Sequence, residues 1–156
     1  MRAPIGTIRQ FRRADAEACS EIVRACLLQD PLMQMLAEEV LPLAESPAIL
    51  CRWAGRFYVA VCALEDSPAG VGGVDMNEIR ILSVHPEHQR EGIGSALLMH
   101  LEDLVPPALF RDVFVYAAPA AEGFYQRHGY RSGGEHVEQL GNVRVPTIFM
   151  SKSLSG

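Results

Sequence analysis

The sequence lacks the cysteine patterns that hold structural zinc. Its four cysteines stand at positions 19, 26, 51 and 62, and no two of them form a C-x-x-C pair. This spacing argues against a zinc site, and we expect no bound metal. Cys19 and Cys26 lie about two turns apart on an expected helix, which is too far for a disulfide. We therefore expect buried free thiols in a reducing cytoplasm.

The sequence also lacks long apolar segments. No apolar run approaches the roughly 18 residues of a membrane-spanning helix, and residues 1–4 do not open an apolar signal-peptide segment. Repeats, low-complexity tracts and an internal linker are absent as well. We therefore expect one domain over residues 1–156, a cytoplasmic location and no membrane partner.

Positive charge is scarce relative to negative charge. The chain has 14 lysine and arginine residues against 19 aspartate and glutamate residues, which gives a net charge of −5. Nucleic acid is therefore a poor partner on electrostatic grounds. An acidic surface suits a cationic or amine substrate.

The most informative stretch that the sequence does contain covers residues 78–98. Residues 79–84 are an apolar run rich in β-formers, so we expect a strand there. Pro86 ends this strand, because proline has no N–H to give to a sheet. Residues 89–94, Gln-Arg-Glu-Gly-Ile-Gly, then lead into a helix whose leucines recur at helical spacing.

The turn before this helix is suited to binding an anion. The first N–H groups of a helix have no partner within it, and the helix dipole adds positive charge there. Gly92 and Gly94 allow close approach of a ligand such as pyrophosphate, and Arg90 adds a full charge. A Walker loop is excluded because no Gly-Lys-Ser/Thr triplet exists, and Leu97 stands where a dinucleotide fingerprint needs glycine. The alternative interpretation is a glycine-softened helix start without a ligand.

Two blocks of the sequence resemble the GNAT superfamily of acyl-CoA-dependent N-acyltransferases. Residues 89–94 match its Gln/Arg-x-x-Gly-x-Gly/Ala motif. Residues 113–117, followed by Phe-Tyr-Gln-Arg-His-Gly-Tyr at 124–130, resemble its fifth strand and its Phe-Tyr-x-x-x-Gly-Phe/Tyr signature. Both blocks stand in the family's order and spacing. The resemblance implies transfer of an acetyl group from acetyl-CoA, as cosubstrate, to a primary amine of an unidentified acceptor.

We expect a mixed α/β fold of the α+β type, with a central sheet of six or seven strands. The sheet should be mostly antiparallel with a splayed parallel pair, which the resemblance implies, and about four helices should flank it. The residue patterns predict a breaker-rich turn at residues 65–70 and a flexible break at residues 133–134. They predict strands at 7–11, 57–63, 71–74, 79–84, 113–117 and 147–150, and helices at 15–29, 32–41 and 120–128, besides a helical turn at 48–53 and the helix after the glycine motif.

The resemblance implies that acetyl-CoA binds along the central strand and the turn after it. Backbone groups of the strand would pair with the pantetheine arm, and the helix start would hold the pyrophosphate. Arg127 either reaches the 3′-phosphate or is a solvated helix charge. The implied coenzyme-binding residues are Leu82, Ser83, Val84, Gln89, Arg90, Glu91, Gly92, Ile93, Gly94, Ser95, Phe124 and Arg127.

The resemblance also implies two catalytic residues. Glu78 would take a proton from the acceptor amine, directly or through water; its alternative role is an ion pair with Arg80. Tyr125 would donate a proton to the leaving thiolate, or else be a half-buried structural tyrosine. His85, next to the proposed site, is either an alternative base or a surface or structural histidine.

One departure from the family pattern follows the fifth strand. Many members carry an asparagine there that bonds to the pantetheine, but residues 117–120 of this chain are Ala-Ala-Pro-Ala. One coenzyme contact is therefore lost, which leaves acyl-chain preference open. Alternatives are transfer of another acyl group, transfer to a protein amine, or a non-catalytic acyl-CoA sensor, which would need neither catalytic residue. Many relatives are dimers, so a homodimer is compatible with the resemblance.

Overall fold

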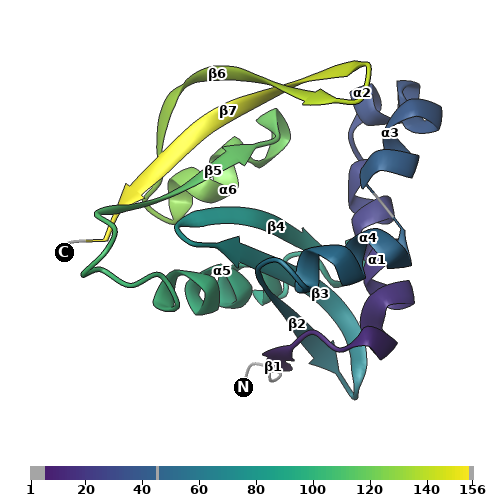
Figure 1. Cartoon of the computed structure of the whole chain (residues 1–156), viewed down its shortest axis with the longest axis horizontal. Coiled ribbons are helices and arrows are strands. Elements are labelled where there is room, and N and C mark those ends of the chain that lie inside the picture. Colours follow the sequence, from purple (N-terminus) through teal and green to yellow (C-terminus); the bar gives the residue numbers. More distant parts are fainter. Residues whose placement is uncertain (1–5, 45, 155–156) are drawn as a thin grey trace.

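The computed structural model describes residues 6–44 and 46–154, which form one seven-stranded mixed sheet (Figure 1). The strand order is β1-β2-β3-β4-β5-β7-β6. Every neighbouring pair is antiparallel except β4 and β5, which run parallel. The strands are β1 (Thr7–Gln10), β2 (Tyr58–Leu64), β3 (Ser67–Asp75), β4 (Glu78–Val84), β5 (Asp112–Ala117), β6 (Arg131–Leu140) and β7 (Val143–Ser153). The expected fold class is confirmed.

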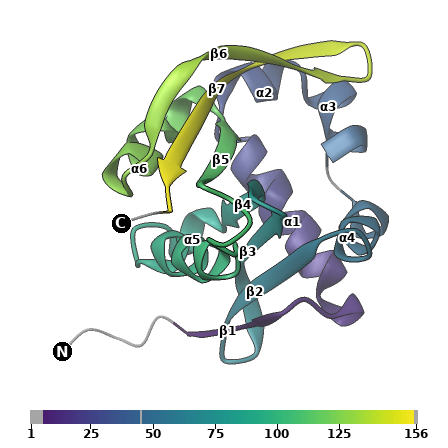
Figure 2. The same cartoon turned by 60° about the vertical axis from the view of Figure 1, so that its left-hand side comes forward.

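Helices lie on both faces of the sheet (Figures 1 and 2). Buried side chains of α5 and α6 pack with those of β5 on one face, and buried side chains of α1 and α4 pack with those of β2 and β3 on the other. The α-helices of the described residues are α1 (Ala16–Leu27), α2 (Pro31–Met35), α3 (Ala37–Ala44), α4 (Pro47–Ala54), α5 (Ile93–Asp103) and α6 (Glu122–Arg127).

A β-bulge in β4 changes which face of the sheet its side chains point to. Gly73 pairs with Ile81 and Val74 pairs with Ile79, so Arg80 is an extra residue on β4. In a regular strand Ile79 and Ile81 would share a face. Here Ile79 packs in the core beneath α5, whereas Ile81 packs in the core beneath α1 and α4.

Beyond the bulge, β4 and β5 separate. Their parallel pairing comprises only Glu78 with Phe114 and Ile79 with Val115. The remaining residues of β4 pair with β3 alone. This is the splayed parallel pair that the sequence was expected to form.

Glycines in β3 allow α5 to lie close to the sheet. A Cβ atom on Gly70 would lie 2.9 Å from Cγ2 of Ile93, and one on Gly72 would lie 3.0 Å from Cδ1 of Leu101. A side chain at Gly70 would require Ile93 to shift, and one at Gly72 would press on the end of the Leu101 side chain. The close contact at Ile93 fixes the start of α5 beside the end of β4.

The helices before β2 differ from their predicted bounds. The single helix expected over residues 32–41 is wrong: the chain forms α2 and α3, and Pro42 lies inside α3. Asp30 caps α2 by accepting a hydrogen bond from the N–H of Leu32 at 2.9 Å. Ser46 caps α4 in the same way, accepting from Ile49 at 3.1 Å, so the expected helical turn is a full helix. The chain therefore has six α-helices in its described part instead of about four.

The predicted break at residues 133–134 is also wrong, because both glycines lie inside β6. The register of β6 shifts between Ser132 and Gly134, which marks a bulge. A Cβ atom on Gly133 would lie 2.7 Å from the ring of Phe149, so the glycine makes room for this ring. Strand β6 was not predicted, because it carries mostly exposed, polar residues. Strand β7 is longer at both ends than the predicted strand at residues 147–150.

The breaker-rich turn is shorter than residues 65–70. Only Glu65 and Asp66 lie between β2 and β3, and both have positive φ angles, as the tightest hairpin turns require. None of the four cysteines, all within the described part, forms a disulfide. No helix within residues 6–44 and 46–154 is long and apolar enough to cross a membrane.

Candidate functional site

The turn between β4 and α5 has the backbone shape of an anion-binding loop. Arg90 and Gly92 both adopt left-handed conformations, with φ angles of 66° and 88°. Such conformations curl successive N–H groups toward one side, and their occurrence at a residue other than glycine is typical of functional sites. Gly92 is the N-cap of α5 and has no side chain to cap it. The first N–H groups of α5 therefore need a ligand or water as their partner.

Gly94 lies where three elements meet. A Cβ atom there would contact the ring of Phe124 on α6 at 3.5 Å and Cγ2 of Val84 on β4 at 3.6 Å. One residue on, the hydroxyl of Ser95 lies 2.9 Å from Nε2 of His128, which joins α5 to the end of α6. The two sequence blocks that carry the family resemblance are thus adjacent in space.

The backbone groups of Leu82 and Val84 face the gap between β4 and β5. The N–H of His85 donates to the carbonyl of Ala69 on the β3 side at 2.8 Å. Since alternate residues of an antiparallel strand face the same neighbour, Leu82 and Val84 face away from β3. No residue of β5 pairs with β4 beyond Ile79. This edge of β4 can therefore accept an extended ligand.

The carbonyl of Val84 is already occupied. It accepts hydrogen bonds from the thiol of Cys26 at 2.9 Å and from Nε2 of Gln89 at 3.0 Å. Burial raises the pKa of the Cys26 thiol, which keeps it protonated and able to donate. Gln89 also donates to Gln29 at 2.9 Å. Gln89 and Cys26 thus hold the end of β4 against α1, and of the two backbone groups of Val84 the N–H remains for a ligand. Sequence reasoning missed Cys26, because no sequence pattern links it to β4.

The other predicted coenzyme-binding residues surround the same turn or end α6. The carboxylate of Glu91 lies 3.5 Å from Nδ1 of His88. Ile93 is only 1% exposed, so its backbone alone can meet a ligand. Arg90 and Arg127 are exposed, Arg127 as the last residue of α6.

Glu78, at the start of β4, is a partly buried carboxylate in a charged cluster. Its side chain is 23% exposed, and Oε1 lies 3.6 Å from Nη1 of Arg80. The ion pair with Arg80, which was the alternative role of Glu78, is therefore present, and the same guanidinium also lies 3.8 Å from Asp75. The pKa of Glu78 is raised above its ordinary value, mainly by burial. The positive charge of Arg80 lowers this pKa, and the negative charges of Glu138 and Asp75 raise it further. A carboxylate with a raised pKa is a stronger base than a solvated one.

Tyr125 is buried at the centre of α6. It is 5% exposed, and its ring makes edge-on contacts with Phe124 and Tyr130 at centroid distances of 5.2 and 5.3 Å. Burial raises the pKa of its phenol, so the hydroxyl stays protonated at neutral pH. Tyr125 therefore keeps the proton that a general acid must donate.

Glu78 and Tyr125 lie on opposite faces of the sheet. Tyr125 belongs to the same buried cluster as Ile79, beneath α5 and α6. Successive side chains of a strand point to opposite faces, so Glu78 points to the other side. The two residues can act on one molecule only through the gap between β4 and β5.

His85 has a structural contact. Its Nδ1 accepts a hydrogen bond from the N–H of Glu87 at 3.1 Å and caps the short 3-10 helix Pro86–His88. This contact favours the structural interpretation of His85 over the alternative base.

A set of aromatic rings beside Glu78 was missed by sequence reasoning. Phe114 pairs in register with Glu78, and the ring of Phe114 contacts those of Tyr116 and Phe149. The alternation Phe-Val-Tyr at residues 114–116 could have indicated that both rings share a face.

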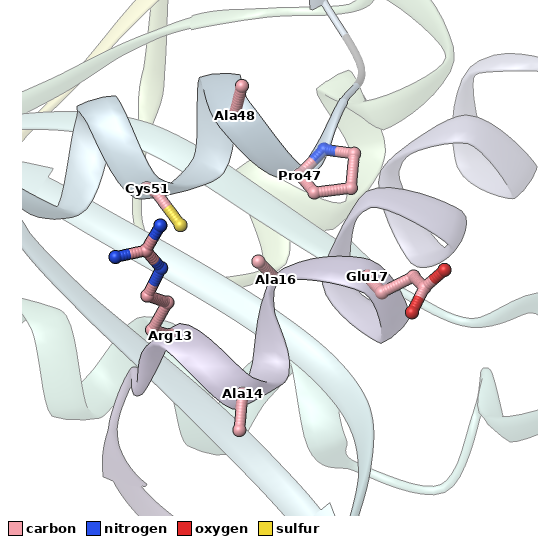
Figure 3. A pocket seen from close by; sticks show the side chains of 7 residues that line it. All are labelled: Arg13, Ala14, Ala16, Glu17, Pro47, Ala48 and Cys51. Carbon is pink, nitrogen blue, oxygen red and sulfur yellow. The ribbon is translucent and has the colours of Figure 1, made fainter.

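A surface pocket lies away from these residues, between the starts of α1 and α4 (Figure 3). In Figure 3 the Arg13 guanidinium points toward Cys51 and the Glu17 carboxylate points outward. The pocket shares no residue with the predicted site. Its lining residues are Arg13, Ala14, Ala16, Glu17, Pro47, Ala48 and Cys51. Among the described residues, no group of three histidine, cysteine or acidic side chains is arranged to hold a metal ion.

Solved structures share this architecture along nearly the whole chain. A GCN5-related N-acetyltransferase from Rhodopseudomonas palustris superposes with a TM-score of 0.89, at 21% identity, covering 99% of both chains. The ribosomal-protein-S18-alanine N-acetyltransferase of Escherichia coli has a TM-score of 0.70 at 19% identity, covering 96% of this chain and 94% of its own. A phosphinothricin acetyltransferase from Sinorhizobium meliloti, solved in complex with acetyl-CoA, has a TM-score of 0.71 at 20% identity, covering 97% and 89%.

At these identities the structural likeness shows the fold alone. A search of curated protein sequences gives no significant match. The sequence profile of the acetyltransferase (GNAT) domain, however, matches residues 37–153, which is most of the chain. The chain therefore belongs to the GNAT family of acetyltransferases.

Proposed function

We propose that this protein transfers an acetyl group from acetyl-CoA to a primary amine by direct attack. The observation that carries the proposal is the gap between β4 and β5, which ends at an uncapped, glycine-lined helix start. Such a gap suits an extended pantetheine arm, and such a helix start suits its pyrophosphate. Two proteins of similar fold, from Sinorhizobium meliloti and Thermoplasma acidophilum, were solved with acetyl-CoA and with coenzyme A respectively, which supports the choice of cosubstrate.

The cosubstrate is held mainly by backbone groups in this proposal. The N–H groups at the start of α5 bind the pyrophosphate, and Arg90 adds positive charge beside them. The N–H of Val84 serves the pantetheine or the thioester, because its carbonyl is occupied. Arg127 is the candidate for the 3′-phosphate.

The chemistry needs one base and one acid. Glu78 takes a proton from the acceptor ammonium, and the free amine attacks the thioester carbonyl carbon. The resulting oxyanion is stabilised by an N–H of β4, for which we assign Val84. The C–S bond then breaks, and Tyr125 gives its proton to the departing coenzyme A thiolate. The second proton, which the acylated nitrogen loses, restores the phenol of Tyr125, and Glu78 releases the first proton to solvent. No covalent enzyme intermediate is required.

Replacing Gly94 tests the coenzyme site. Gly94→Glu places bulk and negative charge beside the phosphates, so we expect acetyl-CoA affinity by calorimetry to fall at least about tenfold. Gly94→Ala is the matched control, because its Cβ meets only ordinary contacts of 3.5 Å and longer. Unchanged affinity in the glutamate variant would rule out the pyrophosphate assignment.

Replacing Glu78 tests the base. Because the pKa of Glu78 is raised, its basic form is lost as the pH falls through that value, and kcat/KM should fall with it. Glu78→Gln should lower kcat by about a hundredfold or more, flatten this acidic limb and leave acetyl-CoA affinity unchanged.

Neighbouring charges give a signed control for the same measurement. Glu138 raises the pKa of Glu78, so Glu138→Gln should move the acidic limb to lower pH. Arg80 lowers it, so Arg80→Gln should move the limb to higher pH. If none of the three substitutions changes the acidic limb of the pH–rate profile, the proton is taken by water or by His85 and not by Glu78.

Removing the hydroxyl of Tyr125 tests the acid. A thiolate with a pKa near 8.5 is already a fair leaving group, so the acid helps without being indispensable. Tyr125→Phe keeps the buried ring and should lower kcat by about ten- to a hundredfold, roughly 1.4 to 2.7 kcal/mol of transition-state stabilisation. KM for acetyl-CoA should change little. Parent-rate turnover, with chemistry shown to be rate-limiting, would make Tyr125 structural, and weaker binding with unchanged kcat would make it a coenzyme contact.

A further inference from the structure

Three aromatic rings form one contiguous surface on β5 and β7. The ring centroids of Phe114 and Tyr116 are 5.9 Å apart, those of Phe114 and Phe149 are 5.7 Å apart, and those of Tyr116 and Phe149 are 5.6 Å apart. The imidazole of His136 on β6 extends this surface, at 4.4 Å from the ring of Tyr116. We call Phe114, Tyr116 and Phe149 the aromatic wall.

The aromatic wall lies on the same face of the sheet as Glu78. Glu78 and Phe114 are partners in the parallel register, and Tyr116 and Phe149 are partners between β5 and β7. Partner residues in a sheet project to the same side. The rings therefore begin one strand away from the proposed base and extend outward from it.

The rings of the aromatic wall are partly exposed to solvent, whereas the side chains on the other face of β5 are buried. Val113, Val115 and Ala117 are at most 5% exposed and belong to the core beneath α5 and α6. The alternating residues Phe114 and Tyr116 are only partly buried. A ligand body can therefore contact rings that the protein's own core does not enclose.

The charge beside the wall is negative. Glu78 lies on this face, and the carboxylates of Asp75 and Glu138 both raise its pKa, against the single guanidinium of Arg80, which lowers it. That guanidinium is engaged with Asp75 and Glu78 and lies 5.6 Å from the ring centroid of Phe57. A cationic group is attracted here, and a ligand carboxylate meets mostly like charge.

We infer that the acceptor is an amine carried on an aromatic or similarly flat apolar group, without a carboxylate beside the amine. This inference rests on the proposed acetyl transfer for its reaction, but its recognition elements are separate from the coenzyme site. The ammonium enters toward Glu78 and Glu138, and the ring of the acceptor packs on the aromatic wall by offset or edge-on contacts. Glu78 then removes the proton that the attack requires.

The experiment compares three probes that differ in one feature each. 2-Phenylethylamine has the ring and the cation, ethylamine lacks the ring, and phenylacetate replaces the cation by an anion. Binding is measured by ligand-observed NMR with coenzyme A at saturation, so it does not depend on turnover. We expect 2-phenylethylamine to bind about tenfold or more tightly than either other probe.

Two variants locate the preference on the chain. Tyr116→Leu removes a ring of the wall while keeping apolar bulk, and should weaken 2-phenylethylamine binding about threefold to tenfold without affecting ethylamine. Phe110→Leu is the matched control, because Phe110 packs against the core beneath α5 and should change neither probe. Ethylamine binding serves as the internal check that the variant is folded.

The outcomes separate this inference from the proposed function. Acetylation of amines without preference for the ring, together with equal binding of 2-phenylethylamine and ethylamine, overturns the inference and leaves the transfer reaction standing. Preferential, Tyr116-dependent binding without acetylation of any amine supports the recognition surface and contradicts the transfer. Tighter binding of phenylacetate than of 2-phenylethylamine overturns the charge argument.

Discussion

The proposed chemistry depends on backbone hydrogen-bonding groups that β4 cannot satisfy within the sheet. Every buried N–H and C=O needs a partner, and in a continuous sheet the neighbouring strand supplies it. The bulge at Arg80 and the separation of β5 leave the Leu82 and Val84 side of β4 without that strand. The protein satisfies the Val84 carbonyl with Cys26 and Gln89. The N–H groups on the same edge are left to water or to a bound arm of coenzyme A.

The same separation explains how one molecule can meet groups on both faces. Glu78 lies with Arg80 and the aromatic wall on one side, and Tyr125 is buried on the other. A thioester that lies in the gap can take an amine from the first face and lose its thiolate toward the second. The raised pKa values of Glu78 and Tyr125 have the same origin, burial, and give a stronger base and a protonated acid at neutral pH.

Sequence reasoning succeeded where local chemistry determines local structure. The β-rich run, Pro86 and the two glycines of residues 89–94 predicted a strand, a turn and a helix start, and all three are present. It failed where tertiary packing decides. The glycines at 133–134 were interpreted as a break, but both lie inside β6, and the ring of Phe149 occupies the space that a side chain on Gly133 would take. The polar strand β6 carries no apolar alternation, so only its pairing with β7 identifies it.

The part of the candidate site that we propose for coenzyme binding has a clear signal in the sequence, and the part that we propose for the acceptor has a weaker one. Motifs that bind a ligand through backbone N–H groups require glycine at fixed positions, so they can be recognised in the sequence. The acceptor surface that we propose combines side chains of β4, β5, β6 and β7, such as Glu78, Phe114, Glu138 and Phe149, and these strands are neighbours only because of the strand order. The contact of Cys26 with Val84 spans 58 residues and leaves no local signal at all.

Amide hydrogen exchange along β4 tests the central claim most directly. Resolved by NMR with and without saturating acetyl-CoA, the N–H groups of Leu82 and Val84 should exchange about tenfold or more slowly in the complex, as should those at the start of α5. The N–H of Ser83, which faces β3, is the control within the same strand and should change little. Unchanged exchange at Leu82 and Val84 with the coenzyme bound would contradict the account.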